Sequence, residues 1–350
     1  MAPVELLERP AETPIGIADP RWEEATTPAK EAPTERELAI EAVGLERRFG
    51  SFVAVDKVDL AVRRGEIYEF LGPNGAGKST TCRMLCTLTA PTGGRATVAG
   101  CDVARDPDRV RLRIGAALQA AALDLQQTGA EPLLQQGRYY GLTRQEVETR
   151  LEELRELIDL GDALNGRIKG YSGGMKRRID LAAALIHNPV VLFLDEPTTG
   201  LDPVSRAKVW EEVRRLNHEL GMTIFLTTQY LEEADALADR VGIIDHGRIV
   251  AEGTPEELKR SIGSDVVLVK VDDVETARRV VASVPGVTGV EALGDEVKAS
   301  TADGPGTVSP IAVALAGAGV RVKALTLREP TLDDVFLTLT GNRLQGEEQQ

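Results

Sequence analysis

The chain of 350 residues has only three cysteines and no apolar run near the ~18 residues that a membrane-spanning helix requires. Three cysteines cannot all pair, and Cys82 and Cys86 are four residues apart, which favours buried thiols in a reducing cytoplasm over a disulfide framework. Zinc binding would need more ligands than these. The formal net charge of −14 disfavours nucleic acid as a partner. We expect a soluble, globular protein.

Composition divides the chain into four parts. Residues 1–36 are rich in Pro, Glu, Ala and Thr, and have too few apolar residues to bury a core, so we expect a disordered arm. With 42% hydrophobic residues and a length typical of two domains, the rest is expected to fold as two units, residues 37–262 and 263–342. Residues 343–350 are expected to be a frayed tail.

A glycine-rich stretch organises the first folded unit and matches G-x-x-x-x-G-K-[ST] at every defined position. Its residues are Gly72, Pro73, Asn74, Gly75, Ala76, Gly77, Lys78, Ser79 and Thr80. The glycines let successive backbone N–H groups converge on a phosphate, while Lys78 adds charge and Ser79 a magnesium-ligating hydroxyl. A buried strand at 67–71 and a helix at 80–88 flank the loop, so we predict a nucleoside triphosphate site.

Two further apolar strands end in polar residues. Residues 190–194 lead into Asp195 and Glu196, a pattern that places one carboxylate beside Mg²⁺ and another beside an attacking water. Residues 114–118 lead into Gln119. Glu69 lies in the middle of the strand before the glycine-rich loop, where a small residue would be easier to bury.

The segment from 120 to about 170 turns helical. Thr143 and Glu146 form a capping box before an apolar stripe that either packs on neighbouring helices or shapes a groove for a partner. Strand-like alternation at 38–43, 52–55 and 58–62 predicts a β-rich lead-in before the loop. Phe49 lies between these strands; it is either a core residue or a platform for an adenine ring.

Ser172, Gly173 and Gly174 open another helix, with Ser172 as its N-cap. The first turn carries a basic run ending in Arg177 and Arg178, although the helix dipole disfavours cations there. Either an anion binds at this turn, or the basic residues form a solvated face.

These elements in this order resemble the nucleotide-binding subunit of ABC transporters over residues 38–262. The Ser172-Gly173-Gly174 segment, between the phosphate loop and Asp195-Glu196, distinguishes this family from other NTPases. Finer features resemble the daunorubicin/doxorubicin-resistance branch of ABC exporters: Tyr171 and Met175, the run from Thr227 to Ala234, and the ending from Glu329 to Phe336.

The resemblance implies a role for each site residue. Phe49 would stack on adenine, and residues 72–80 would hold the phosphates. Ser79, Gln119 and Asp195 would hold Mg²⁺, while the catalytic residues would be Lys78, Glu196 and Gln229. Nucleotide contacts would also come from Ser172, Gly173, Gly174 and Asp202. The usual switch histidine is replaced by Gln229 and the usual stacking tyrosine by Phe49, and the first change affects the expected rate of hydrolysis.

The resemblance also implies partners. One phosphate loop and one Ser-Gly-Gly segment per chain predict a head-to-tail homodimer with two ATP·Mg²⁺ sites. In this branch the membrane permease is a separate chain, so we expect a cytoplasmic subunit, peripheral at the inner face of the membrane, that drives efflux of hydrophobic drugs or lipid-like molecules. The alternatives are a soluble ABC-type ATPase acting on nucleic acid or ribosomes, and a nucleotide-dependent switch with little turnover.

The predicted fold class is α/β: a P-loop ABC-type ATPase core with a β-rich lead-in subdomain and a helical insertion, followed by a small C-terminal α+β domain. In the latter, alternating apolar segments between 266 and 324 predict the order βαββαβ. This unit shows no catalytic constellation, so we expect a regulatory or dimer-stabilising role.

Overall fold

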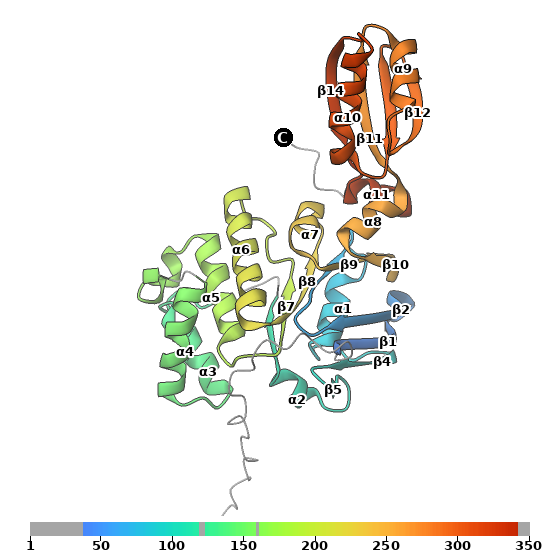
Figure 1. Ribbon diagram of the computed structural model, residues 1–350. Coiled ribbons are helices and arrows are strands. Elements are labelled where there is room, and N and C mark those ends of the chain that lie inside the picture. The colour runs from blue at the N-terminus through green and yellow to red at the C-terminus, as the bar shows by residue number, and fades with distance from the viewer. Residues whose placement is uncertain (1–37, 119–122, 159–160, 342–350) are drawn as a thin grey trace, which may run out of the picture. The chain divides into compact units, whose positions relative to one another are not determined.

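The computed structural model describes residues 38–118, 123–158 and 161–341 (Figure 1). The expected N-terminal arm, the metal ligand predicted at Gln119 and the expected C-terminal tail lie outside these ranges. Within the described ranges, no helix is both long and apolar enough to cross a bilayer.

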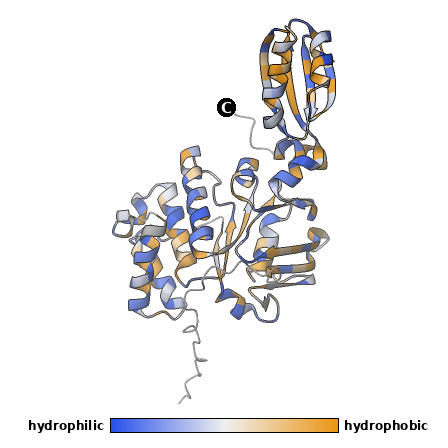
Figure 2. Cartoon of the chain, in the orientation of Figure 1, coloured by the Kyte–Doolittle hydropathy of each residue, from blue (hydrophilic) through white to orange (hydrophobic). Residues whose placement is uncertain are grey.

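A six-stranded sheet in the order β10-β9-β3-β8-β7-β6 forms the centre of the first domain. Its strands are β3 (Ile67–Leu71), β6 (Ile114–Ala117), β7 (Val191–Asp195), β8 (Thr223–Thr228), β9 (Arg240–Asp245) and β10 (Arg248–Gly253). All neighbours are parallel except β9 and β10. Every residue of β3, β7 and β8 is buried, and Figure 2 shows these strands as largely hydrophobic, as expected for a sheet covered on both faces. The carboxyl ends of the five parallel strands therefore meet at one edge.

The predicted β-rich lead-in is a second, antiparallel sheet in the order β2-β1-β4-β5. Its strands are β1 (Leu38–Phe49), β2 (Phe52–Arg63), β4 (Gly93–Val98) and β5 (Cys101–Asp102). The segments expected as separate strands at 52–55 and 58–62 form one strand, because β2 pairs with β1 along its whole length through irregular register. The three cysteines are free and buried, as expected.

Helices cover the central sheet and fill the predicted helical segment. They are α1 (Lys78–Leu85), α2 (Pro107–Arg111), α3 (Ala130–Tyr139), α4 (Arg144–Leu157), α5 (Gly173–Leu185), α6 (Pro203–Leu220), α7 (Leu231–Leu237) and two short 3-10 turns, η1 (Gly161–Leu164) and η2 (Ile168–Gly170). The capping box of Thr143 and Glu146 begins α4. The stripe of α4 is buried in one cluster with α5, so its packing on neighbouring helices is confirmed.

The C-terminal segment has the predicted βαββαβ order. Its elements are β11 (Asp265–Val271), α9 (Val274–Ala282), β12 (Val287–Leu293), β13 (Glu296–Thr301), α10 (Gly304–Gly317) and β14 (Val322–Arg328). The sheet is antiparallel in the order β12-β13-β11-β14, with its own apolar core. The last strand was expected at 320–324 but lies later, because Gly319 turns with φ of 73° and Val320 packs into the core before β14 begins.

Helix α11 (Leu332–Thr340) was not predicted from the sequence. A capping box of Thr331 and Asp334 begins it. Its buried residues Leu332, Val335 and Phe336 do not join the βαββαβ core, but pack with α7, α8 (Pro255–Ile262) and strands β3 and β9. Helix α11 therefore contributes to the core of the ATPase domain.

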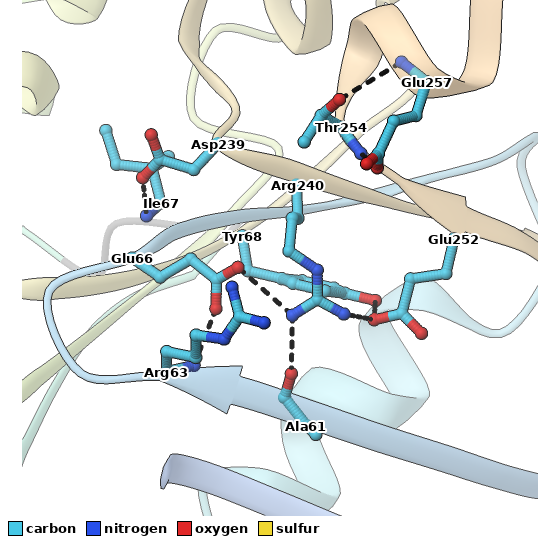
Figure 3. Close-up of polar contacts among 10 residues, drawn as sticks. All are labelled: Ala61, Arg63, Glu66, Ile67, Tyr68, Asp239, Arg240, Glu252, Thr254 and Glu257. Atoms are coloured by element: carbon cyan, nitrogen blue, oxygen red, sulfur yellow. Dashed lines mark hydrogen bonds and ion pairs between the residues drawn. The ribbon is translucent and has the colours of Figure 1, made fainter. Parts of the chain in front are cut away.

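A polar cluster around Arg240 ties the lead-in sheet to the central sheet (Figure 3). The Arg240 guanidinium donates to Ala61 O at 3.0 Å and to Glu66 Oε1 at 3.1 Å, and it also pairs with Glu252. It lies over the ring of Tyr68, whose hydroxyl donates to Glu252 Oε1 at 3.1 Å. One partly buried cation thus links β2, β3, β9 and β10.

Candidate functional site

The glycine-rich loop joins β3 to α1, as the motif requires. Helix α1 begins at Lys78, two residues earlier than predicted. Gly77 has φ of 110°, and a Cβ there would lie 2.6 Å from Ala54 O. At Gly72 a Cβ would lie 2.3 Å from Ile244 O. These two positions therefore admit only glycine without a shift of the backbone.

The ammonium group of Lys78 is held inside this loop. Lys78 is 3% exposed, and Nζ donates to Gly72 O at 2.7 Å and to Pro73 O at 3.0 Å. Burial lowers the pKa of Lys78, while the carboxylate of Glu196, 3.5 Å from Nζ, opposes that effect. A positive charge is thus fixed beside the loop, where the N–H groups at the start of α1 would face a bound phosphate.

Ser79 and Asp195 come together from elements 116 residues apart. Ser79 Oγ donates to Asp195 Oδ1 at 3.0 Å, and Thr227 Oγ1 donates to the same oxygen at 2.6 Å. Asp195 ends β7 and is 1% exposed. A hydroxyl and a carboxylate in contact are the hard oxygen ligands that Mg²⁺ prefers, so these two predicted ligands fit the ion.

Glu196 follows in a left-handed backbone conformation, with φ of 49°. Its N–H donates to Thr227 O at 3.0 Å and to Thr227 Oγ1 at 3.1 Å, which holds the strained residue in place. Thr199 Oγ1 donates to Glu196 Oε2 at 3.3 Å. The structure therefore brings the carboxylate predicted to act on water next to Lys78.

Gln229 directly follows β8, the strand between β3 and β7. It is half-buried, and the preceding Thr228 is fixed because its carbonyl accepts from Gly72 N at 3.3 Å. The residue before the predicted switch residue is thus hydrogen-bonded to the first residue of the phosphate loop.

Phe49 is at the end of β1 and is 50% exposed, so the expectation that it is a core residue is wrong. The turn to β2 places it at the tip of the hairpin, away from the packed faces of the sheet. The Arg47 guanidinium lies 4.5 Å from its ring centroid. An exposed flat ring beside a cation is compatible with stacking on a base.

The Ser-Gly-Gly segment begins α5, with Ser172 as N-cap accepting from Met175 N at 3.2 Å. Ser172 and Gly173 are exposed. The basic first turn is not a solvated face: Arg177 pairs with Asp180 at 3.1 Å, and Arg178 Nε lies 2.8 Å from Glu212 Oε1. Carboxylates of the same domain therefore pair with both arginines and offset the unfavourable helix dipole.

Asp202 caps α6 by accepting from Ser205 N at 3.0 Å and from Ser205 Oγ at 2.6 Å. Hydrogen bonds to Ser205 lower the pKa of its carboxyl group. Its observed contacts are those of an N-cap, and its part in nucleotide binding stays a prediction.

Glu69 is fully buried, and neither carboxylate oxygen has a hydrogen-bond partner among the described residues. Burial, together with Glu233, raises the pKa of Glu69 well above its usual range. Glu233 is itself buried on α7 and accepts from Trp210 Nε1 at 2.9 Å. Glu69 stands out in the sequence as a carboxylate in the middle of an apolar strand, whereas Glu233 does not, because a glutamate on a short helix is ordinarily exposed and only the packing of α7 on the sheet buries it.

Two family models match the chain: ABC transporter over residues 55–199, and ATP-binding protein DrrA1-3-like, C-terminal domain, over residues 253–340. The chain is 49% identical over 314 residues to the daunorubicin resistance ATP-binding protein DrrA2 of Streptomyces coeruleorubidus, covering 89% of this chain and 97% of that one. It is 46% identical over 312 residues to the daunorubicin/doxorubicin resistance ATP-binding protein DrrA of Streptomyces peucetius, covering 88% and 94%. It is 40% identical over 310 residues to the Nod factor export ATP-binding protein I of a Rhizobium species, covering 88% and 99%.

Solved structures agree with these matches. An ATP-binding subunit of an ABC transporter superposes with a TM-score of 0.58 at 29% identity, covering 64% of this chain and 93% of that one. The likeness to a dimeric cassette solved with ADP and Pi has a TM-score of 0.56 at 24% identity and covers 61% and 98%; it shows the fold alone. The predicted α/β fold class is confirmed. With the phosphate loop, the paired carboxylates and the Ser-Gly-Gly helix in place, the chain belongs to the ABC transporter ATP-binding proteins, ATPases coupled to transport, in the group with a DrrA-like C-terminal domain.

Proposed function

We propose that this subunit hydrolyses ATP to energise export of a hydrophobic drug or lipid-like molecule through a separate membrane permease. The observation that carries the proposal is the meeting of Lys78, Ser79, Asp195 and Glu196 at one edge of the sheet, with contacts of 3.0 and 3.5 Å. The names of relatives at 40 to 49% identity, which refer to daunorubicin resistance and Nod factor export, support the direction and the substrate class.

In this proposal each residue of the nucleotide site has one task. Phe49 stacks on adenine and residues 72–80 bind the phosphates, with Lys78 countering their charge. Ser79, Asp195 and Gln119 hold Mg²⁺, which would neutralise charge on the phosphate oxygens.

The remaining residues act on the attacking water and on the terminal phosphate. Glu196 orients the water through its carboxylate, which accepts from Thr199, while Thr227 holds the backbone N–H of Glu196. Gln229 donates a hydrogen bond to the terminal phosphate, since an amide N–H can donate without being charged.

Ser172, Gly173 and Gly174 are proposed to contact the nucleotide of a second copy, with Asp202 close to the same interface. Ser172 and Gly173 are exposed, and the helix that they begin directs N–H groups outward. Because each chain has one phosphate loop and one such helix, a head-to-tail homodimer would complete two sites.

A hollow of about 530 Å³ offers a place for the permease. Leu88, Tyr139, Asp180 and Ala183 are among the residues that line it, and they come from α3, α5 and the segment after α1. Leu88 is 57% and Tyr139 73% exposed, so these two side chains offer apolar contacts to a partner at a hollow that also has polar residues such as Asp180. We propose that a cytoplasmic helix of the permease binds here and holds the subunit at the inner face of the membrane.

Glu196→Gln tests the catalytic assignment. The amide keeps the size of the side chain but cannot act as a base, so ATP binding should persist while hydrolysis stops and the ATP-bound dimer accumulates. Size-exclusion chromatography with Mg-ATP should show a stable dimer of the variant. A variant that stays monomeric, or that hydrolyses ATP at the wild-type rate, would contradict the role of Glu196.

Ser172→Arg tests whether the site is shared between two chains. We expect hydrolysis to fail while the ATP affinity of the monomer is unchanged. Mixing it with Lys78→Ala subunits creates dimers in which one of the two sites has neither substitution, and partial activity should return. Weaker ATP binding by the Ser172→Arg monomer would place this helix in its own chain's site.

Co-expression with a candidate permease tests the transport role. The subunit should sediment with membranes only when the permease is present, and a charge introduced at Tyr139 should release it. The same variant should bind ATP as the wild type does, because Tyr139 is on α3 and not at the nucleotide site. Membrane association without a permease would refute this part of the proposal.

A further inference from the structure

Two buried carboxyl groups lie between the strand that leads into the phosphate loop and helix α7. Glu69 is in the middle of β3 and Glu233 is on α7, and both side chains are fully buried. The residues that flank them on the two elements are packed in shared apolar clusters: Leu71 with Ala234, and Ile67 with Leu237. The two carboxyl groups are therefore enclosed where β3 and α7 pack together.

The hydrogen bonds of the two groups are unequal. Trp210 Nε1 of α6 donates to Glu233 Oε1 at 2.9 Å, but Glu233 Oε2 has no partner among the described residues. Glu69 has no partner there at either oxygen. An ionised carboxylate that is buried without a donor or a cation is very unfavourable, so Glu69 carries a proton. Its hydroxyl can donate to the free oxygen of Glu233, which satisfies one atom of each group.

The surrounding charges favour the proton on Glu69. Burial, together with Glu233, raises the pKa of Glu69 well above its usual range. Burial also raises the pKa of Glu233, but Trp210 and the guanidinium of Arg206 on α6 favour its charged form. Glu233 also acts on the cation of Arg177 on α5. The pair therefore holds one proton and one negative charge, and it titrates as a unit.

The other charged groups on the elements around α7 have partners of their own. They are Lys259, which pairs with Asp235, Arg214, which donates to Ala236 O, Asp239, which accepts from Ile67 N, and Asp334, which caps α11. Asp235 is exposed, so its ion pair holds the outer side of α7. The contact of α7 with β3 depends on the carboxyl pair and its apolar neighbours.

Helix α7 follows the switch position directly. Gln229 is two residues before Leu231, the first residue of α7, and on its other side Thr228 O accepts from Gly72 N at 3.3 Å. The helix has only seven residues, and its N-cap residue Tyr230 makes no side-chain cap, so tertiary contacts must hold it in place. A displacement of α7 would therefore move Gln229 relative to the phosphate loop.

We propose that one proton shared by Glu69 and Glu233 latches α7 to β3 and thereby holds Gln229 in place. When hydroxide takes up this proton and forms water, two carboxylates face each other in the core, and their repulsion loosens the helix. ATP hydrolysis then slows at alkaline pH through a pair of residues that touches neither the nucleotide nor the attacking water. The link to Gln229 rests on the proposed function, whereas the latch itself does not.

Hydrogen exchange of the full chain without nucleotide measures the latch. In the wild type, the protection of the α7 amides should fall about tenfold or more between about pH 6 and about pH 9, after correction for the intrinsic exchange rate. Glu69→Gln donates the same hydrogen bond without a titrating proton, so its α7 protection should stay constant. Glu69→Met removes the bond, and its α7 protection should already be low at about pH 6.

Infrared difference spectra detect the proton itself. The wild type should show a carboxylic acid C=O band at neutral pH that shifts in D₂O and is absent from Glu69→Gln. Glu66→Gln is the matched control, because Glu66 directly precedes β3 and is also buried, but it pairs with Arg240 at 3.1 Å and not with α7. This variant should keep both the acid band and the α7 protection.

The ATPase rate as a function of pH tests the link to Gln229. The wild-type rate should fall over the same pH range as the α7 protection, while Glu69→Gln keeps its rate. Equal α7 protection in the wild type and Glu69→Gln at every pH, higher protection in Glu69→Met, or a wild type without the acid band would each overturn the latch.

An alkaline loss of rate that Glu69→Gln shares with the wild type would overturn the link between the latch and Gln229. A wild-type chain without ATPase activity would instead refute the proposed function, and the exchange and infrared results would still decide whether the latch exists.

Discussion

Phe336 connects helix α11 to the base of the nucleotide site. It is 1% exposed on α11 and packs in one cluster with Leu71, Ala234 and Ile243. Leu71 directly precedes Gly72 of the phosphate loop, and Ala234 is on the helix that follows Gln229. Replacing Phe336 with alanine would therefore open a cavity between α11 and the strand that carries the loop.

The size of the effect follows from burial. A buried phenylalanine cut to alanine loses the transfer free energy of its ring and leaves a cavity, together about 3–5 kcal/mol. The ring of Phe336 is surrounded by residues of several elements, so the site has little freedom to collapse, and we expect about 4 kcal/mol. A loss of this size is a large fraction of the stability of a typical domain.

Urea unfolding of the full chain measures the loss, and hydrogen exchange shows where it acts. In Phe336→Ala we expect faster exchange of the α11 amides, because the helix can detach when its anchor is removed. Leu339, 42% exposed on the same helix, provides the control: Leu339→Ala should change stability by less than about 1 kcal/mol. A loss below about 1 kcal/mol for Phe336→Ala, or equal losses in both variants, would refute the packing of α11 on the ATPase core.

Three further predictions concern the switch position, His187 and the contact of α3 with α4. Gln229→Ala should slow turnover by about one to three orders of magnitude, as expected for one lost donor at developing charge; steady-state rates within about twofold of wild type would exclude that role. Burial lowers the pKa of His187 to about 4, below its unfolded value near 6.5, so His187 should reduce stability by up to about 3 kcal/mol as the pH falls from 6.5 to 4. Melting temperatures of His187→Phe between pH 5.5 and 7.5 should therefore depend less on pH than those of the wild type, and an unchanged dependence would contradict this. Gly137→Ala would place a Cβ 2.4 Å from Val147 Cγ2 and should cost about 1–3 kcal/mol in urea unfolding, whereas Gly170→Ala, with open space around it, should be nearly neutral.

The sequence alone determined the features that depend on neighbours within a few residues. The phosphate loop, the N-caps at Thr143 and Ser172 and the buried strand before Asp195 are local patterns, because a cap or a turn is decided by residues three or four positions away. The order of the elements followed from the same patterns and was enough to indicate the family.

Only the tertiary structure decided which residues face each other across the sheet. It brought Ser79 to Asp195, turned Arg177 inward and left Phe49 exposed, since each depends on partners distant in sequence. Helix α11, which was not predicted from the sequence, shows the same limit: an apolar stripe indicates burial without naming the surface that covers it, so only the structure places Phe336 in one cluster with residues of α7 and α8.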